Sequence, residues 1–251
     1  KKGELALLIK SKSTSSLGFF YEALTDYIGL ESNEPGKTMG LASYGKPVYN
    51  LYKYFKVNDG IISLADNGGI NTMLDFDEQE QVHAYWENKF KKLIPQKNSK
   101  TRKFDKKSSF FSTSVDFSEE YKNLAASGQF ALEKIILELV EWAVKKTGIK
   151  NLCLAGGVAL NCVMNGKLLQ SGLIKDIFIQ PMAHDAGAAL GAAQACNNQP
   201  IKRFDGVYLG PEFSDREIRE ELNRNKIAYR KSKDICKEAA SILKDGNIVG
   251  W

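Results

Sequence analysis

The feature that most constrains the fold is a strand–glycine–helix–strand–helix pattern in the second half of the chain. Two apolar runs of strand length are separated by a helical stretch, and a glycine pair directly follows the first run. Successive strands joined by a crossover helix run parallel in one sheet, so the pattern predicts an α/β fold. The expected elements are a buried strand over Asn151–Ala155, a turn at Gly156-Gly157, a helix from about Val158 to Gln170, a strand over Asp176–Gln180 and a tightly packed Ala/Gly-rich helix over Asp185–Cys196.

Further elements are expected in the first half of the chain. Apolar residues at helical spacing predict helices over Leu17–Ile28 and Asp116–Thr147, each of which ends at a glycine. Asp59-Gly60 predicts a turn between two strand-like segments, the second of which is Ile61–Leu64. The less clear-cut expectations are a strand over Leu5–Ile9, a glycine-rich loop over Glu31–Pro47, a short helix within 48–56, helical parts within 74–93 and a loop over 95–115.

The chain is expected to contain two domains, residues 1–198 and 199–251. A linker-like stretch at Asn197–Lys202 precedes a second alternation of strand-like and helical segments. Because the chain begins with Lys1 rather than Met and stops after strand-like residues, we expect a fragment of a longer protein. The second alternation, β-α-β-α-β, covers Phe204–Leu209, Asp215–Asn223, Ala228–Tyr229, Asp234–Lys244 and Ile248–Trp251.

The charge distribution argues against a nucleic-acid surface over the whole chain. The 251 residues carry 35 Lys and Arg against 30 Asp and Glu, a net charge of +5. Residues 89–107 hold nine of the basic residues and one acidic residue, so the rest of the chain is slightly acidic. This segment is interpreted as a solvated charge run, with contact to a partner or an anionic substrate as the alternative.

The cysteines and the lengths of the apolar runs are typical of a cytoplasmic protein. None of the four cysteines has C-x-x-C spacing and there are only two histidines, which disfavours a structural zinc site. Cys153 lies in the first apolar run, where we expect a buried free thiol. No apolar segment reaches 18 residues, so no membrane span is expected.

Two candidate ligand-binding stretches lie in the strand–helix pattern. Gly156 and Gly157 separate a strand from a helix, where backbone N–H groups can approach a phosphate, and Asn161 can hydrogen-bond a ribose or a base. A turn without a ligand is an equal alternative for the glycine pair. Asp185 follows His184 at the start of the next helix, so it either binds a metal or caps the helix.

A third candidate stretch, Glu34–Gly45, is a glycine-punctuated segment with one lysine. Its Lys37 and backbone amides suit an anionic ligand, although the spacing is not that of a Walker A motif. A surface loop without a ligand is the alternative. No Ser–His–Asp arrangement is apparent in the sequence, and the catalytic residues stay unassigned.

Together these stretches resemble the O-carbamoyltransferase family that includes NodU, CmcH and TobZ. The matching motifs follow the family's order along most of the chain. They are Ser16–Gly29 (SLG-x-x-Y-x-x-x-T-x-x-x-G), Glu34–Gly45 (E-x-GK-x-MGLA-x-YG), Asn123–Ser127 with Gln129 at the head of the long helix, Leu154–Asn161 (GGVALN) and Asp185–Ala193 (DxGxxxGAA).

The resemblance implies an actin-like ATPase domain (ASKHA, RNase H-like) over residues 1–198 and the start of a YrdC-like α/β domain over 199–251. In the family, the YrdC-like domain makes carbamoyl-adenylate from carbamoyl phosphate and ATP, and the actin-like domain transfers the carbamoyl group to a hydroxyl of a small molecule. By the same resemblance, the nucleotide contacts are Gly156, Gly157, Val158 and Asn161, the substrate-binding residues are Glu34, Lys37, Gly40, Leu41 and Gly45, and the metal ligand is Asp185.

The resemblance also implies a divalent metal, expected to be iron, and leaves a homodimer open. The family's metal-binding histidine pair lies upstream of Lys1, so this chain alone is expected to be inactive. Two alternatives stay open: another ASKHA-fold ATPase or sugar kinase, which would need no carbamoyl phosphate, and a non-catalytic nucleotide-binding module. Neither a membrane nor a nucleic acid is expected as a partner.

Overall fold

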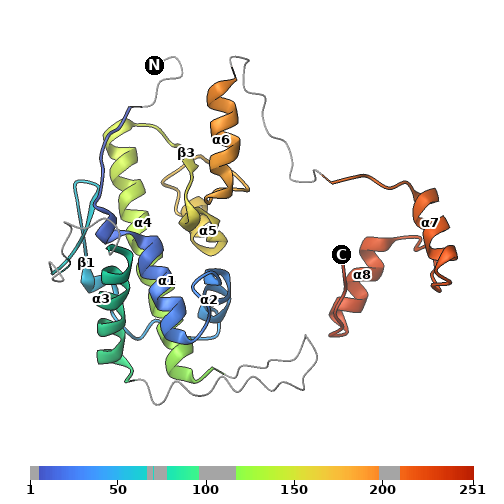
Figure 1. Cartoon of the computed structure of the whole chain (residues 1–251), viewed down its shortest axis with the longest axis horizontal. Helices are drawn as coiled ribbons and strands as arrows, with labels where there is room; N and C mark the ends of the chain where they lie inside the picture. The colour runs from blue at the N-terminus through green and yellow to red at the C-terminus, as the bar shows by residue number, and fades with distance from the viewer. Residues whose placement is uncertain (1–5, 67–69, 71–77, 96–116, 198–209) are drawn as a thin grey trace. The chain divides into compact units, whose positions relative to one another are not determined.

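A computed structural model of the chain describes residues 6–66, 70, 78–95, 117–197 and 210–251 (Figure 1). The chain forms two units, Lys1–Ile201 and Lys202–Trp251. The described strands form two small sheets of two strands each, among many more helices. The expected mixture of helices and strands is therefore confirmed, while the actin-like and YrdC-like assignments stay predictions. The loop expected over 95–115 lies almost wholly outside the described residues.

The first unit contains both sheets and the long helix. The predicted helices over Leu17–Ile28 and up to Thr147 are confirmed, and the long helix begins at Glu119. The elements of this unit are η1 Ser13–Ser15, α1 Leu17–Ile28, α2 Pro35–Ala42, η2 Tyr52–Tyr54, β1 Phe55–Asn58, β2 Ile61–Leu64, α3 Glu78–Leu93, α4 Glu119–Thr147, β3 Asn151–Leu154, η3 Gly157–Leu160, α5 Cys162–Gln170, β4 Asp176–Ile179 and α6 Ala186–Cys196.

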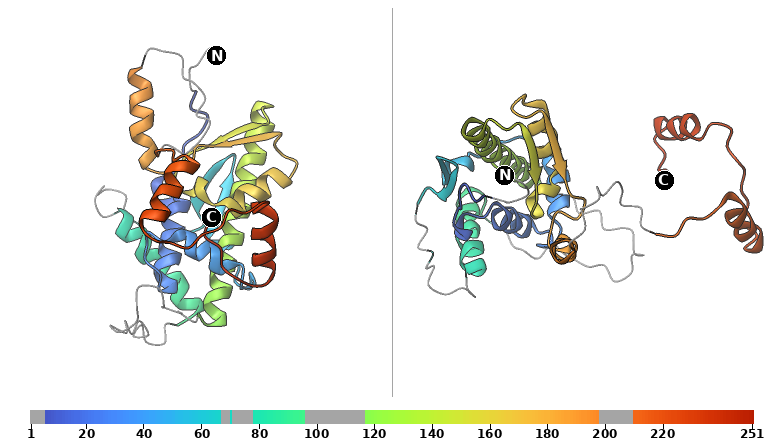
Figure 2. Two further views of the ribbon diagram at one scale, coloured as in Figure 1. Left: turned by 90° about the vertical axis from the view of Figure 1, so that its right-hand side faces the viewer. Right: turned by 90° about the horizontal axis from the view of Figure 1, so that it is seen from above.

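A large hydrophobic core joins α1, α3, α4 and the β1–β2 hairpin. Helix α1 contacts α2, α3 and α4, an arrangement visible in two orthogonal views (Figure 2). The fully buried Trp86 of α3 is the centre of an aromatic cluster. Its ring lies 4.6 Å from that of Phe20 and 5.0 Å from that of Phe55, measured between centroids. Such aromatic side chains bury the largest apolar areas of any residues, so this cluster anchors α1 and α3 to the hairpin.

The predicted turn at Asp59-Gly60 is confirmed. Strands β1 and β2 pair antiparallel, with Asn58 opposite Ile61. Both turn residues have positive φ, 49° and 79°, which is the geometry of the two-residue turn that best matches the twist of a hairpin. A Cβ at Gly60 would also lie 2.5 Å from the Trp142 ring of α4, so the turn packs directly against the long helix.

The parallel pairing expected from the strand–helix–strand pattern is also confirmed. β3 and β4 run parallel, with Asn151 opposite Asp176 and Leu154 opposite Ile179. Leu152 and Leu154 pack against a second core that is formed with α4 and α5. Because neighbouring strand residues point to opposite faces, Cys153 points away from this core and is exposed. The expectation of a buried Cys153 was therefore wrong.

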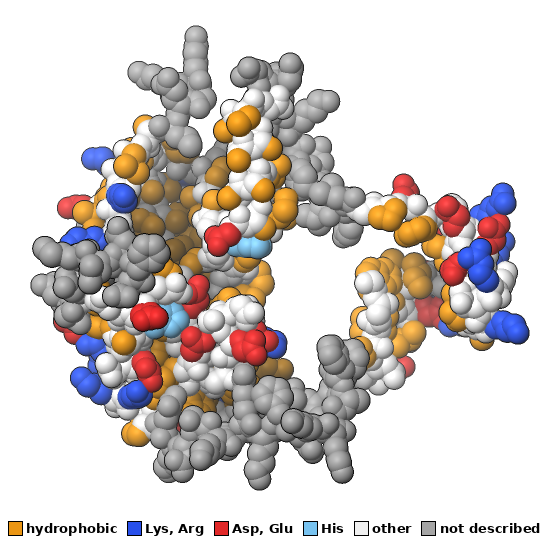
Figure 3. Space-filling view, viewed as in Figure 1, with side chains coloured by type: hydrophobic (Ala, Val, Ile, Leu, Met, Phe, Trp, Pro, Cys, Tyr) orange, Lys and Arg blue, Asp and Glu red, His pale blue; other side chains and the backbone are white. Residues whose placement is uncertain are grey.

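Three other expectations are corrected. None of the residues of α6 is buried, so this helix is not tightly packed, and its hydrophobic side chains lie at the surface in Figure 3. Residues 6–9 form no strand, and Leu7 is 80% exposed, because no described segment pairs with them. Within 48–56 the helical part is limited to the single 3₁₀ turn η2.

No helix among the described residues combines the length and apolarity that crossing a membrane requires.

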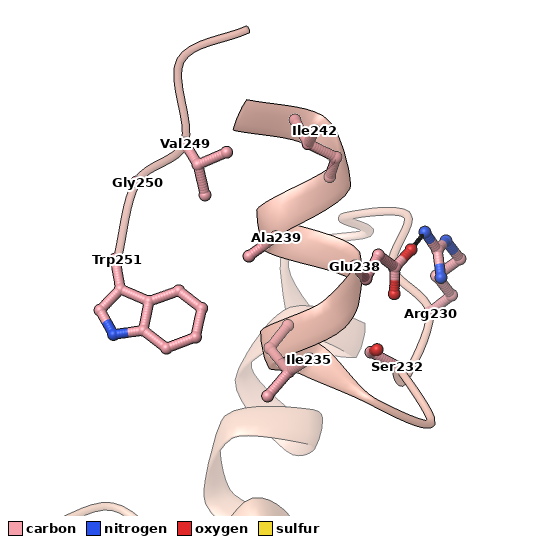
Figure 4. Close-up of a pocket in the computed structure, with 9 residues that line it drawn as sticks. All are labelled: Arg230, Ser232, Ile235, Glu238, Ala239, Ile242, Val249, Gly250 and Trp251. Atoms are coloured by element: carbon pink, nitrogen blue, oxygen red, sulfur yellow. Dashed lines mark ion pairs between the residues drawn. The ribbon is translucent and has the colours of Figure 1, made fainter. Parts of the chain in front are cut away.

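In its described part, residues 210–251, the second unit contains two amphipathic helices, α7 Asp215–Arg224 and α8 Ile235–Lys244. Both helices of the predicted β-α-β-α-β alternation are confirmed, whereas its strands at Ala228–Tyr229 and Ile248–Trp251 are wrong, because residues 210–251 contain no strand. Without a paired neighbour, the strand-like segments there cannot form a hydrogen-bonded ladder. The strand predicted over Phe204–Leu209 lies outside the described residues. Trp251, the apolar face of α8 and the Arg230–Glu238 ion pair line an open pocket of about 490 Å³ (Figure 4).

The segment that follows α2 in the first unit is fastened to the first turns of α4. The backbone N–H of Lys46 donates to Asn123 Oδ1 (2.7 Å), and that of Tyr49 donates to Ser127 Oγ (3.0 Å). A Cβ on Gly45 would lie 2.1 Å from the backbone oxygen of Lys122, a distance that no side chain tolerates. Gly45 therefore allows a close backbone approach that sets the position of α2 on α4.

Two glycine substitutions are expected to have opposite effects on stability. Gly45→Ala forces the backbone away from α4 and should lower the free energy of unfolding by about 1–3 kcal/mol. Gly40→Ala places its methyl group in open space within α2 and should raise that free energy by up to about 1 kcal/mol. Urea unfolding of both variants measures the difference, and equal effects would contradict the close approach at Gly45.

Asp66 is expected to make folding sensitive to acid. Hydrogen bonds from Lys89 Nζ and Tyr85 Oη hold the pKa of the Asp66 carboxyl below its ordinary value of 3.8. A lowered folded-state pKa stabilises the protein above the ordinary pKa, and the stabilisation disappears as the pH falls through the lower value. Asp66→Asn should therefore cost up to about 1 kcal/mol at pH 7, because the pair is partly solvated, and less near pH 2, where the carboxyl becomes protonated. Unfolding free energies at the two pH values test this, and an equal loss at both would contradict it.

Candidate functional site

The glycine pair forms an open turn at the end of the parallel sheet. Gly156 has φ +95°, a conformation that favours glycine, and its N–H donates to the backbone oxygen of Ala183 (2.7 Å) in the segment after β4. A Cβ built on Gly156 or Gly157 meets no atom within 4 Å, and both residues are exposed. The carboxyl ends of parallel strands are where α/β sheets bind ligands, so the turn lies where a ligand can approach its backbone.

The helix expected from about Val158 is interrupted. η3 covers Gly157–Leu160, and Asn161 then adopts an extended conformation that ends it. The side-chain oxygen of Asn161 accepts a hydrogen bond from the backbone N–H of Met164 (3.0 Å), so Asn161 is the N-cap of α5. The predicted continuous helix was wrong over these residues because a cap of this kind requires a non-helical backbone.

Asn161 is tied to the interior by a buried network of polar side chains. Its amide exchanges two hydrogen bonds with the amide of Gln129 on α4, at 2.8 and 3.0 Å. Gln129 also accepts a hydrogen bond from Tyr21 Oη of α1 and donates one to Glu133, each at 2.8 Å. Glu133, 3% exposed, forms an ion pair with Lys167 of α5. Burial and the Glu133 charge raise the pKa of Tyr21 well above its usual range, which keeps the phenol a donor.

This network was missed by the sequence reasoning. Gln129 and Glu133 lie one helical turn apart on a part of α4 where most neighbours are apolar, and both are at least 95% buried. Polar residues four apart on the apolar face of a long helix are a readable signal, because buried polar groups need partners. The partners themselves, on α1 and α5, could not be read from the sequence.

The stretch predicted as a glycine-rich loop contains a helix. α2 begins at Pro35, whose fixed φ suits the first helical position, and Glu34 precedes it. Thr38 is fully buried and donates a hydrogen bond to Thr25 Oγ1 of α1 (2.9 Å). Burial of one face thus stabilises a helix that its glycines alone disfavour, and the loop expectation over Pro35–Ala42 was wrong.

The predicted substrate-binding residues take different places on α2 and after it. Glu34 and Lys37 form an ion pair near the start of the helix, and the Lys37 side chain is 63% exposed. Gly40 is exposed with open space above it, while Leu41 packs against the core. Gly45 lies against the backbone of α4, so its role in the structure is to fix the segment that follows the helix.

The structure brings α2 into contact with the start of α5. Met39 Sδ of α2 lies 3.9 Å from Cys162 Sγ, the residue that follows Asn161. Gly18 at the start of α1 is near Val158, with a built Cβ 3.9 Å from Cγ2 of that valine. The predicted substrate stretch on α2 thus meets the chain directly after the predicted nucleotide stretch, within the first unit (Figure 1).

Asp185 stands at the start of α6 without capping it through its side chain. His184 Nδ1 accepts the neighbouring N–H of Ala186 at 3.4 Å instead. Within the described ranges, no group of three or more His, Cys, Asp or Glu residues could hold a metal. Asp185 therefore lacks the partners that a metal site needs among these residues, and a metal there would depend on ligands from elsewhere.

Searches of known proteins find relatives along nearly the whole chain. Nodulation protein NolNO of Sinorhizobium fredii is 36% identical over 258 residues, which cover 99% of this chain and 34% of that protein. Nodulation protein NolO of Bradyrhizobium diazoefficiens is 35% identical over 257 residues, which cover 98% and 42%. The uncharacterized protein sll1178 of Synechocystis sp. is 34% identical, covering 94% and 38%. The chain thus spans 34–42% of the length of these relatives.

A family model describes the region that contains the candidate site. The model of the carbamoyltransferase N-terminus matches residues 2–194, from the start of the first unit to α6. The match includes the glycine turn, α2, the buried network and Asp185. The chain therefore belongs to the carbamoyltransferase N-terminus family.

Proposed function

We propose that this chain is part of an enzyme that transfers a carbamoyl group from carbamoyl-adenylate to a hydroxyl of a small acceptor. The carbamoyl-adenylate would be made from carbamoyl phosphate and ATP. The observation that carries the proposal is the family match over residues 2–194. The contact between α2 and the start of α5 supports it, because a transferase must hold its two substrates side by side.

The proposed reaction needs positioning more than a reactive side chain. The acceptor oxygen attacks the carbonyl carbon of the mixed carbamoyl–phosphate anhydride, and the bond from that carbon to the phosphate oxygen breaks. The products are a carbamate ester and AMP, and the hydroxyl proton leaves to a base. Neutralising the departing phosphate and aligning the two oxygens supply most of the acceleration. No described residue is assigned as the base.

The residues of the site have separate parts in this proposal. The open backbone at Gly156 and Gly157 would accommodate the phosphate of the adenylate, and Asn161 would contact its nucleoside. The exposed side of α2, with Lys37 and Gly40, would face the acceptor and the transferred group. The proposed iron at Asp185 requires additional ligands, and none of these parts depends on it.

The reaction type can be separated from that of a sugar kinase or another nucleotide-dependent ATPase. A protein that contains this chain and the remaining length of its relatives should release AMP from ATP only when carbamoyl phosphate is present. A kinase would instead transfer phosphate from ATP without carbamoyl phosphate, and that result would contradict the proposal. The 251-residue chain alone should bind adenine nucleotide without carbamoyl transfer.

Gly157 offers a charge-specific test of nucleotide binding. Gly157→Asp should weaken ATP binding by about tenfold or more, because a carboxylate at the open turn repels phosphate. Gly157→Asn, of the same size but neutral, should stay closer to the wild type. Isothermal calorimetry with ATP measures all three proteins. Binding that is equally strong with Asp at this position would contradict a phosphate site at the turn.

A further inference from the structure

The amide of Gln129 lies where α1, α4 and α5 meet, and all four of its hydrogen-bonding positions are used. Its oxygen accepts from Tyr21 Oη and from Asn161 Nδ2, both at 2.8 Å. Its nitrogen donates to Glu133 Oε1 at 2.8 Å and to Asn161 Oδ1 at 3.0 Å. An amide offers two donors and two acceptor positions, so Gln129 is satisfied completely.

The direction of these bonds follows from groups at both ends of the network. The backbone N–H of Met164 can only donate, so the Asn161 atom that faces it must be the carbonyl oxygen. At the other end, the Glu133 carboxylate pairs with Lys167 and accepts, so the Gln129 atom that faces it must be the nitrogen. Both constraints require the same orientation of the two amides, independently of how similar their oxygen and nitrogen atoms look.

This arrangement restricts what Asn161 can offer to a ligand. Its oxygen already accepts two hydrogen bonds, from Gln129 and from Met164. Its nitrogen carries two hydrogens, of which Gln129 takes one. The Asn161 side chain also forms a hydrogen bond with Tyr21, so its donors and acceptors all have partners within the network, and the part of Asn161 is to fix the start of α5.

We propose that Gln129 is a positioning residue of the nucleotide site: through Asn161 it fixes the backbone after the glycine turn, so that the turn keeps the conformation that accepts the nucleotide. The inference rests on the proposed function, because it concerns the site that would bind the adenylate. Gln129 touches Asn161 and acts through it.

The first test replaces Gln129 by an apolar side chain of similar length. Gln129→Met keeps the volume but removes both bonds to Asn161, so the start of α5 is held less firmly behind the glycine turn. ATP affinity measured by calorimetry on the 251-residue chain should fall by about tenfold or more. The matched control is Tyr52→Phe, which removes the hydrogen bonds from Tyr52 Oη to Glu138 farther along the same helix but leaves Asn161 untouched. Its ATP affinity should stay within about twofold of the wild type.

A second variant tests positioning by pH and stays informative if Gln129→Met folds poorly. Gln129→Glu has the shape of the amide but cannot donate when it is ionised. The titratable groups around it are Tyr21 from α1 and Glu133 on α4, with Lys167 of α5 bound to Glu133. Two neighbouring carboxyls hold a proton more readily than one, and the introduced carboxyl donates again once it is protonated. The ATP affinity of this variant, relative to the wild type, should therefore recover as the pH is lowered from about 8 to about 6.

The outcomes separate the inference from the function on which it rests. A wild-type chain that binds no ATP would overturn the proposed nucleotide site. Wild-type binding that Gln129→Met leaves unchanged would overturn the positioning role alone. A loss of affinity in Tyr52→Phe as large as that in Gln129→Met, or a flat relative pH profile for Gln129→Glu, would reduce Gln129 to a structural residue and would also overturn the inference.

Discussion

A buried carboxylate, Glu133, is the constraint on which the arrangement around the candidate site depends. A charge with 3% exposure is costly unless it is paired and hydrogen-bonded, and Glu133 meets that requirement with Lys167 and Gln129. Lys167 belongs to α5 and Gln129 to α4, so satisfying the charge docks one helix on the other. The same hydrogen bonds pass from Gln129 to Asn161, which starts α5. The polar network thus links helices α4 and α5, which the surrounding hydrophobic core packs against each other.

Around this network, each packing contact has a consequence for the site. The aromatic cluster of Trp86 holds α1 in place, and α1 supplies Tyr21 to the network and Thr25 to α2. The backbone approach at Gly45 places the end of α2 against α4. α2 then reaches Cys162 through Met39. The exposed glycine turn is therefore a small open surface on a rigid support, as a site that works by positioning requires.

The sequence predicted the elements that depend on local chemistry. The hairpin turn at Asp59-Gly60, the helix of Leu17–Ile28 and the parallel pairing of β3 with β4 follow from residue preferences and periodicity. The sequence did not predict the elements whose structure depends on tertiary contacts. α2 was taken for a loop because its glycines disfavour a helix, and the burial of Thr38 that offsets them could not be seen.

At the candidate site, too, the sequence predicted the local pattern but not the tertiary contacts. The glycine pair and Asn161 were found because a strand followed by glycines and a helix is a recognisable pattern. The partners of Asn161 were not found, since Gln129 is 32 residues away in sequence and Tyr21 is 108 residues from Gln129. The ligands that would accompany Asp185 in a metal site could not be predicted from the sequence, because metal ligands come from segments that are distant in the sequence. A single sequence therefore does not show which side chains pair with a buried charge in the core.

The central claim is that the glycine turn and α2 form one nucleotide-dependent site. Hydrogen–deuterium exchange of the backbone amides, followed with and without ATP, tests it most directly. The account predicts slower exchange at Gly156–Val158 and at the exposed residues of α2, with little change in the β1–β2 hairpin. Protection confined to other segments, or no protection by ATP at any concentration up to the millimolar range, would contradict it.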